Sequence, residues 1–142
     1  MSDTHREVGL EKIGPARFRA TNARGGVITL GGGDDPDFTP VELLLAALAG
    51  CAAVTVDPIT ARRATATVFR VAAMGEKVRD EVGTRMQNLT VTFDVEFPEG
   101  PEGDAARAIL PSAIARTHDR LCTVSRTVET GERVVMGVAT GR

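Results

Sequence analysis

The chain has 142 residues, a length that fits one domain or at most two small lobes sharing a core. Its 17 basic and 19 acidic side chains give a net charge of −2, which argues against a protein that binds nucleic acid by neutralising phosphates. Aromatic residues make up only 4% of the chain, with no Trp and no Tyr, so base stacking is not expected either. We therefore expect a single domain over residues 1–142 without a nucleic-acid partner.

The N-terminus and the longest apolar run indicate a soluble protein. The first ten residues, MSDTHREVGL, contain no apolar stretch of the kind found in secretory signals. The longest apolar run, residues 43–56, is shorter than the roughly twenty residues that cross a bilayer. We expect a cytoplasmic protein with no membrane partner, in which both cysteines are mostly thiols because that compartment is reducing.

Residues 17–30 predict a β-hairpin. Their sequence, RFRATNARGGVITL, places an Asn-Ala-Arg-Gly-Gly turn before the apolar pair Val27-Ile28. The glycine-rich residues 31–38 predict a loop, and they lack the Lys and hydroxyl of a phosphate-binding loop. Arg24 lies in the predicted turn, where the ordinary expectation is an arginine exposed to solvent.

A long apolar helix is predicted to begin at Thr39. Pro40 fits the first helical position, and Glu42 lies three residues after the Thr39 cap, as in a capping box. The run VELLLAALAGCAAVTV is apolar around nearly its whole circumference, which predicts a helix buried on all sides, within a core or between two subunits. Pro58 is expected to end or kink this helix, since it lacks a backbone donor.

The second half of the chain predicts two strands, a helix and a closing strand. Residues 65–78 are weakly patterned as a strand, and residues 88–97 alternate as in a half-buried antiparallel strand. Residues 104–121 predict a helix with Asp104 as its cap. Residues 133–139 predict the last strand. This order of elements predicts an α+β protein.

The two cysteines are the main candidates for chemistry. The ordinary role of a free Cys is that of a small buried apolar residue. Small residues around Cys51 leave room beside its sulfur, whereas Arg120 and Arg126 lie near Cys122, where a cation would lower the pKa of the thiol. Spacing leaves open whether the sulfurs pair, because pairing requires Cα atoms within about 7 Å.

Two further polar residues have competing interpretations. His118 lies four residues before Cys122 on one helix face, a spacing that metal sites use. With two His and two Cys in the chain the ligand set is short, so we expect no metal and no cofactor, and His118 is expected to be a surface or interface residue. Glu42 is either the third residue of a capping box, which is favoured, or a reacting carboxylate.

The motifs TPVELLLAALAGC and H-x3-C-T-V-S, in that order, resemble those of the OsmC/Ohr family of osmotically inducible and organic-hydroperoxide-resistance proteins. The resemblance runs from the RFRATNARGG hairpin to the final RVVMGV segment. It implies an OsmC-like α+β fold with antiparallel sheets around a long, buried central helix. It also implies that two chains intertwine into a homodimer with two active sites at the interface.

The resemblance further implies a thiol-dependent peroxidase that acts on organic hydroperoxides. Cys51 would be the peroxidatic thiolate, which attacks the peroxide and becomes a sulfenic acid. Cys122 would resolve it as a disulfide, which a small dithiol such as a lipoyl group then reduces. An Arg of the early hairpin would stabilise the thiolate, and Arg24 is the best positional match, with Arg19 in reserve. A buried thiol needs such a cation because burial disfavours its charged form.

Two positions depart from the family pattern and predict a divergent OsmC-like member. Many hydroperoxide reductases carry a carboxylate directly after the Pro that starts the helix, where this chain has Val41. Glu42 lies about 100° further round the helix, so it replaces that carboxylate only if the helix is rotated. The Pro that usually follows the second Cys is Thr123 here. Two alternatives are therefore a non-catalytic dimer that binds an apolar small molecule, and a redox switch that signals through a Cys51–Cys122 disulfide.

Overall fold

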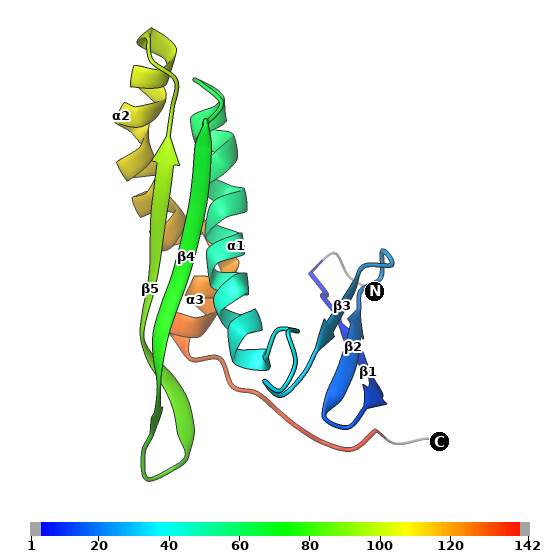
Figure 1. Ribbon diagram of the computed structural model, residues 1–142. Helices are drawn as coiled ribbons and strands as arrows, with labels where there is room; N and C mark the ends of the chain where they lie inside the picture. The colour runs from blue at the N-terminus through cyan, green and yellow to red at the C-terminus, as the bar shows by residue number, and fades with distance from the viewer. Residues whose placement is uncertain (1–3, 140–142) are drawn as a thin grey trace. The chain divides into compact units, whose positions relative to one another are not determined.

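The computed structural model describes residues 4–139 and confirms the predicted α+β class (Figure 1). Two separate antiparallel sheets and three α-helices make up the described part of the chain. The chain divides into two compact units, Met1–Ala46 and Ala47–Arg142. The boundary falls inside the first helix, α1 (Pro40–Ala61), so each unit contains part of that helix.

The first unit contains a three-stranded antiparallel sheet in the order β1-β2-β3. The predicted hairpin is confirmed as β2 (Arg17–Thr21) and β3 (Val27–Leu30). The first strand, β1 (Gly9–Gly14), was not predicted, because its six residues begin and end with glycine and show no clean alternation. The pairing of β1 with β2 is what reveals it as a strand.

The turn between β2 and β3 is held by its own side chain. Asn22 Oδ1 accepts hydrogen bonds from the N–H groups of Arg24, at 3.0 Å, and Gly26, at 2.8 Å. Gly25 has a φ of 90°, which an L side chain rarely adopts. The Asn-Ala-Arg-Gly-Gly sequence therefore specifies this turn locally, and Arg24 is exposed within it, as expected.

Helix α1 begins at the predicted capping box. The Thr39 N–H donates to Glu42 Oε1 at 2.8 Å, and the Glu42 N–H donates to Thr39 Oγ1 at 3.2 Å. The helix does not end at Pro58, however, but continues to Ala61. Pro58 removes the donor for one carbonyl, that of Val54, and Val54 is 71% exposed, so water can satisfy the carbonyl.

A single chain does not bury α1 on all sides, and the predicted burial between two subunits stays a prediction. The buried residues of α1 form one stripe at four-residue spacing: Leu48, Ala52, Val56 and Thr60. The single chain has too few neighbouring elements to wrap all of a 22-residue helix, so the rest of its circumference is partly or fully exposed. By length and composition α1 could cross a membrane, since its most apolar 18-residue stretch has a mean hydropathy of 1.8. The core helix of a soluble protein can have the same length and hydropathy.

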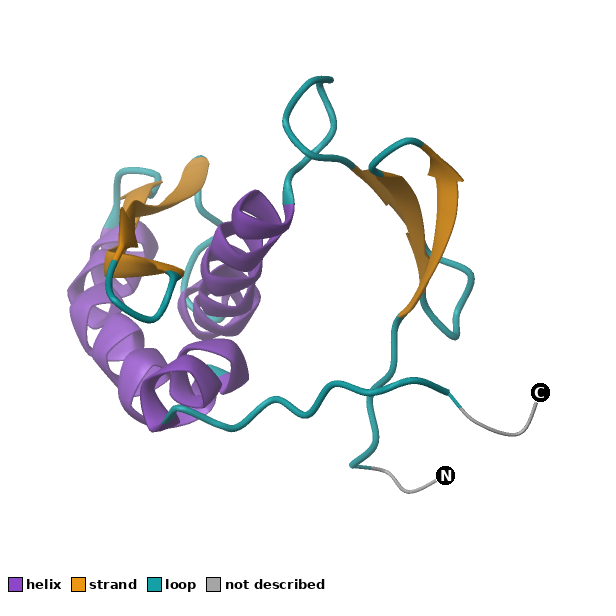
Figure 2. Ribbon diagram, turned by 90° about the horizontal axis from the view of Figure 1, so that it is seen from below, coloured by secondary structure: helices purple, strands orange, loops and turns teal. Residues whose placement is uncertain are grey.

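The second unit is built on a long antiparallel hairpin of β4 (Val68–Arg79) and β5 (Thr84–Glu96). The predicted alternation is confirmed over residues 88–96 of β5, where the polar side chains are exposed and the apolar ones are partly buried: Leu89, Val91, Phe93 and Val95. The helices of this unit, including α2 (Pro101–Arg116) and α3 (Thr123–Thr130), lie along one face of the hairpin (Figure 2). The apolar face of β5 is thereby covered.

Helix α2 begins earlier than predicted and ends in an unusual turn. Its cap is Gly100, with a φ of 112°, rather than Asp104, because Pro101 fits the first helical position. After α2 the chain passes through a π-helical turn, η1 (Thr117–Leu121), before α3 begins. The predicted helix over residues 104–121 is thus an α-helix followed by a π turn, and α3 was not predicted.

The predicted closing strand at residues 133–139 does not form in the described part of the chain. Residues 132–139 adopt no regular secondary structure, and the apolar side chains among them are 78% to 94% exposed: Val134, Val135, Met136 and Val138. A strand needs a neighbour to receive its backbone hydrogen bonds, and no strand of the described residues pairs with this segment. The β-like sequence is therefore left without a partner.

Candidate functional site

Cys51 and Cys122 come together in the second unit. Cys51 lies in α1, Cys122 caps the N-terminus of α3, and both are free thiols. Their side chains lie close enough for each thiol to shift the pKa of the other. Cys51 is partly exposed, whereas Cys122 is only 2% exposed. The tertiary fold thereby makes neighbours of two thiols that are distant in sequence, while their pairing stays a prediction.

The π turn places Cys122 at the start of α3. The Cys122 N–H donates to the Thr117 carbonyl at 2.8 Å, the i→i+5 pattern of a π turn. The Cys122 backbone is then extended, and its Sγ accepts the Ser125 N–H at 3.5 Å as an N-cap. The Ser125 hydroxyl donates to the Cys122 carbonyl at 3.3 Å. Single π turns are rare and concentrate at functional sites, which draws attention to this cap.

The two thiols differ in acidity. Burial acts to raise the pKa of Cys122, but hydrogen bonds from the hydroxyl and N–H of Ser125 and from Cys51 outweigh it and hold that pKa below its ordinary value. Burial raises the pKa of Cys51, and the neighbouring Cys122 adds to this, although a backbone N–H of α3 opposes it. The pKa of Cys122 is thus lowered and that of Cys51 raised. The groups that lower the pKa of Cys122 are Ser125, Cys51 and a backbone donor of α3 rather than Arg120 or Arg126, which the sequence had suggested.

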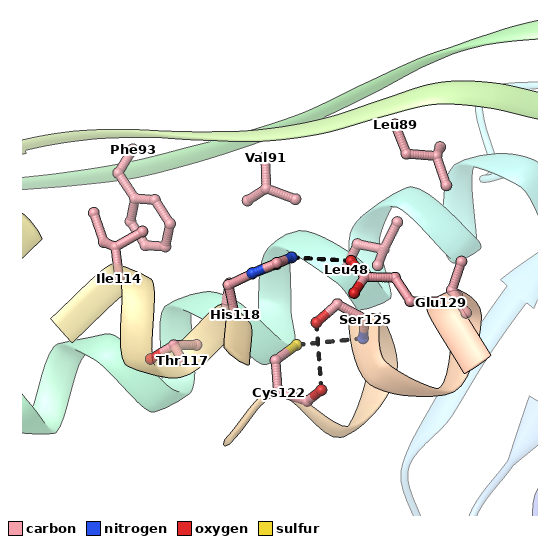
Figure 3. A pocket seen from close by; sticks show the side chains of 12 residues that line it. Leu48, Leu89, Val91, Phe93, Ile114, Thr117, His118, Cys122, Ser125 and Glu129 are labelled. Carbon is pink, nitrogen blue, oxygen red and sulfur yellow. Dashed lines mark hydrogen bonds and ion pairs between the residues drawn. The ribbon is translucent and has the colours of Figure 1, made fainter. Parts of the chain in front are cut away.

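Cys122 lies in the wall of an apolar cavity of about 310 Å³ (Figure 3). The side chains of β5 face it from one side, while His118, Cys122 and Ser125 face it from the other. Seven apolar residues line it: Leu48, Ala52, Leu89, Val91, Phe93, Ile114 and Val128. Its volume is at the lower end of the range for small-molecule sites. The arrangement offers a sulfur beside a space suited to a hydrocarbon group.

A charged cluster borders this cavity. His118 Nδ1 is 2.9 Å from Asp119 Oδ1, and His118 Nε2 is 2.9 Å from Glu129 Oε2. These carboxylates, Asp119 first, raise the pKa of His118 above its ordinary value. The side chain of His118 is 60% exposed, which confirms that it is a polar surface residue. Among residues 4–139, no group of three or more His, Cys, Asp or Glu side chains is arranged to hold a metal ion.

Arg24 and Glu42, the other two predicted site residues, belong to the first unit. The Arg24 side chain is exposed and forms no ion pair with the described residues of that unit. Arg19, the reserve, lies 3.3 Å from Glu11. Glu42 caps α1 through its contact with Thr39, so its favoured interpretation is confirmed. A role for Arg24 or Glu42 at the thiols stays a prediction.

Ser125 is the site residue that the sequence analysis missed. The signal was present in the motif, because a Ser three residues after a Cys at a helix start has the spacing of a cap and its N3 partner. It was overlooked because α3 itself was not predicted.

The comparisons with known proteins place the chain in a family. A family model described as OsmC-like protein matches residues 31–136. An uncharacterized protein of Mycobacterium tuberculosis is 30% identical over 134 residues, which is 93% of this chain and 95% of that protein. Among solved structures, an OsmC-like protein of unknown function from Vibrio cholerae has a TM-score of 0.72 at 16% identity, covering 89% of this chain and 94% of that one.

A second solved structure carries a functional description. A protein from Legionella pneumophila, described as an organic hydroperoxide resistance protein OsmC, has a TM-score of 0.56 at 14% identity, covering 90% of this chain and 91% of that one. At such identities the structural likeness establishes the fold, while the family model and the mycobacterial relative establish membership. The chain belongs to the OsmC-like protein family and has the soluble α+β fold of that family.

Proposed function

We propose that this protein is a thiol-dependent peroxidase that reduces organic hydroperoxides with Cys51 and Cys122. The observation that carries the proposal is that the two thiols are neighbours, close enough to shift each other's pKa, because a two-cysteine cycle requires sulfurs that can reach each other. Family membership supports a general redox role, and the Legionella relative is described as an organic hydroperoxide resistance protein.

In the proposed cycle Cys51 reacts first. Its thiolate attacks one peroxide oxygen, the O–O bond breaks, the other oxygen leaves as an alcohol after taking up a proton, and Cys51 becomes a sulfenic acid. Cys51 suits this step because it is partly exposed, whereas Cys122 is 2% exposed. The Cys122 thiolate then attacks the Cys51 sulfur, so that a disulfide forms and the hydroxyl leaves as water. A small dithiol, such as a lipoyl group, reduces the disulfide.

Cys51 needs a cation to ionise, because burial and the neighbouring Cys122 raise its pKa. We expect Arg24 to supply it, with Arg19 in reserve, and Glu42 to orient that arginine. The cycle also needs a compartment in which dithiols stay reduced, which agrees with a cytoplasmic location.

A homodimer is part of the proposal. The exposed apolar surface of α1, which includes Val54, and the exposed apolar residues 134–138 are surfaces that a second chain would bury. The expected result of size-exclusion chromatography with light scattering is a particle of twice the chain mass of 15.0 kDa. A monomer at every concentration would remove this part of the proposal and leave the cysteine chemistry to be tested by itself.

The proposed substrate class follows from the cavity. Apolar side chains line most of its wall, so it favours a hydroperoxide with a hydrocarbon group over hydrogen peroxide. We therefore expect the reduced protein to react faster with cumene hydroperoxide than with hydrogen peroxide at equal concentration.

Thiol counting after rapid mixing with cumene hydroperoxide tests the cycle. The wild type is expected to lose both thiols for each peroxide consumed, Cys51→Ser none, and Cys122→Ser one, with a sulfenic acid that dimedone captures on Cys51. Ser112→Ala, which removes an exposed hydroxyl on α2, is a matched control and should behave as the wild type. No thiol loss in the wild type, or equal loss in Cys51→Ser, would refute the proposal.

The cavity also supports a second candidate, a non-catalytic dimer that binds an apolar small molecule. A hydrophobic compound that purifies with the protein, together with no peroxide consumption, would favour this function. The contact between the sulfurs argues for the peroxidase instead, because a binding cavity has no need of two neighbouring thiols.

A further inference from the structure

The cavity beside Cys122 is open against α1 where the buried stripe of that helix narrows. Two residues of the stripe, Leu48 and Ala52, line the cavity. Val56 and Thr60, one and two turns further along, are fully enclosed by the surrounding structure. Among the described residues that line the cavity, Ala52 has the smallest side chain. The space therefore lies where the stripe changes from a leucine to an alanine.

Ala52 also lies close to the thiol pair. It follows Cys51 directly in α1, and Cys122, the neighbour of Cys51, lies in the wall of the same cavity (Figure 3). A hydroperoxide that presents its O–O bond to Cys51 has a hydrocarbon group to place, and the cavity offers that group apolar space beside the two thiols. A hydrocarbon group in this space lies against the methyl group of Ala52.

The wall that β5 contributes is held in place by β4. Leu89, Val91 and Phe93 are alternate residues of β5 and so line the cavity from one face of the hairpin. The Phe93 ring meets the Phe69 ring of β4 edge-on, with the ring centroids 6.2 Å apart. The backbone of β5 is paired with β4 along the same stretch. A larger side chain at position 52 would therefore fill the cavity rather than push this wall back.

The wall that α3 contributes is less firmly held. Ser125, Val128 and Glu129 line the cavity from one face of α3, and this helix of eight residues has no buried residue. Its N-terminus is capped by Cys122 Sγ, and Glu129 is 2.9 Å from His118 in η1. These two contacts hold α3 against the cavity. If α3 moved outward nonetheless, the size of the side chain at position 52 would have no effect on what the cavity accepts.

We propose that Ala52 is a specificity-determining residue: the hydrocarbon group of the hydroperoxide lies in the cavity against the Ala52 methyl group, and the small size of that side chain admits a bulky aryl or branched alkyl group. The inference rests on the proposed function for the reaction itself. It adds the place where the hydrocarbon group binds and the residue that limits its bulk.

The first test compares two hydroperoxides in stopped-flow measurements of thiol loss from the full, reduced chain. Ala52→Leu adds three carbon atoms to the wall, and Leu is as suitable for a helix as most residues, so α1 should be retained. The rate with cumene hydroperoxide, divided by the rate with hydrogen peroxide, should fall by about tenfold or more, which is what a misfit of one methylene can cost in an apolar pocket.

The matched control is the same substitution at another position of α1. Ala46 is exposed and does not line the cavity, so Ala46→Leu should leave the ratio of the two rates as it is in the wild type. An unchanged ratio in Ala52→Leu, or an equal fall in Ala46→Leu, would overturn the proposal.

A second substitution separates specificity from damage to the fold. Filling a cavity can overpack a core, so guanidinium unfolding of each variant is measured first. Ala52→Val adds two carbon atoms instead of three and keeps the test valid if Ala52→Leu lowers the unfolding midpoint. The ratio of the two rates should decrease in the order Ala, Val, Leu at position 52. Any other order among the folded variants would overturn the proposal.

Binding in the cavity can also be measured without any hydroperoxide. The probe is 2-phenyl-2-propanol, the alcohol that reduction of cumene hydroperoxide would release. In a Cys51→Ser chain, this alcohol should slow the alkylation of Cys122 by iodoacetamide, because Cys122 faces the cavity. The concentration that gives half protection should be about tenfold higher when Ala52→Leu is added.

This measurement distinguishes the inference from the proposed function. If the wild type consumes no hydroperoxide, the peroxidase proposal fails, whereas protection of Cys122 that depends on position 52 would still place the hydrocarbon group against Ala52. No protection with Ala52 present, or equal half-protecting concentrations in the two chains, would overturn the inference whether or not the protein is a peroxidase.

Discussion

Oxidation of the cysteine pair should stabilise the protein strongly. A disulfide between Cys51 and Cys122 closes the loop that contains β4, β5, α2 and η1. In the chain-entropy model, closing a loop of this length removes enough freedom from the unfolded chain to contribute about 4 kcal/mol. Because the two thiols are already neighbours in the reduced protein, the bond should form with little rearrangement. At about 2–4 °C per kcal/mol for a chain of this size, the melting temperature should rise by roughly 10 °C.

Thermal and guanidinium unfolding of diamide-oxidised and reduced protein measures this difference. Cys122→Ser, which cannot form the bond, should give the same midpoint before and after diamide treatment. Equal midpoints for the oxidised and reduced wild type would show that the bond does not stabilise the fold and would contradict the redox switch. A lower midpoint after oxidation would show that the native geometry opposes the disulfide.

Three further predictions concern single residues. Gly103→Ala should destabilise the protein by about 3 kcal/mol or more in guanidinium unfolding, because a Cβ there would lie 1.7 Å from the Pro98 carbonyl oxygen. Gly50→Ala, in open space on α1, is the control and should stabilise the protein by about 0.5–1 kcal/mol. Similar effects of the two substitutions would contradict the packing at α2. Glu42→Gln should keep the cap of α1, and hence the unfolding midpoint, since Gln also accepts the Thr39 N–H. A loss of peroxide reactivity in this variant would show that Glu42 does more than cap the helix. Full reactivity would refute the proposal that Glu42 orients the arginine. The carboxylates beside His118 raise its pKa, so the stability that this pairing contributes is present below the ordinary pKa of His and is lost as pH rises through the raised value. His118→Gln should therefore lower the unfolding midpoint slightly at pH 5.5 and not at pH 9. An equal effect at both pH values would contradict the charge pairing.

Features that depend on a few neighbouring residues were predictable from the sequence. The capping box at the start of α1, the turn held by Asn22 and the alternation along β5 each involve contacts within one element or one turn. Their geometry follows from local backbone preferences and from the period of a strand. The resemblance of two motifs was enough to indicate the family and the two cysteines, although it said nothing of how acidic each sulfur is.

Other features required contacts between residues far apart in the chain. Only the tertiary structure brings Cys51 against Cys122, and only the π turn after α2 presents Cys122 to Ser125, so the acidity of each thiol was decided there. The partial exposure of α1 in the single chain and the missing strand at residues 133–139 differ from the expectation for the same reason. An apolar pattern determines that a segment will bury its side chains or pair its backbone if a neighbour is present, but the neighbour is supplied by the rest of the fold or by another chain.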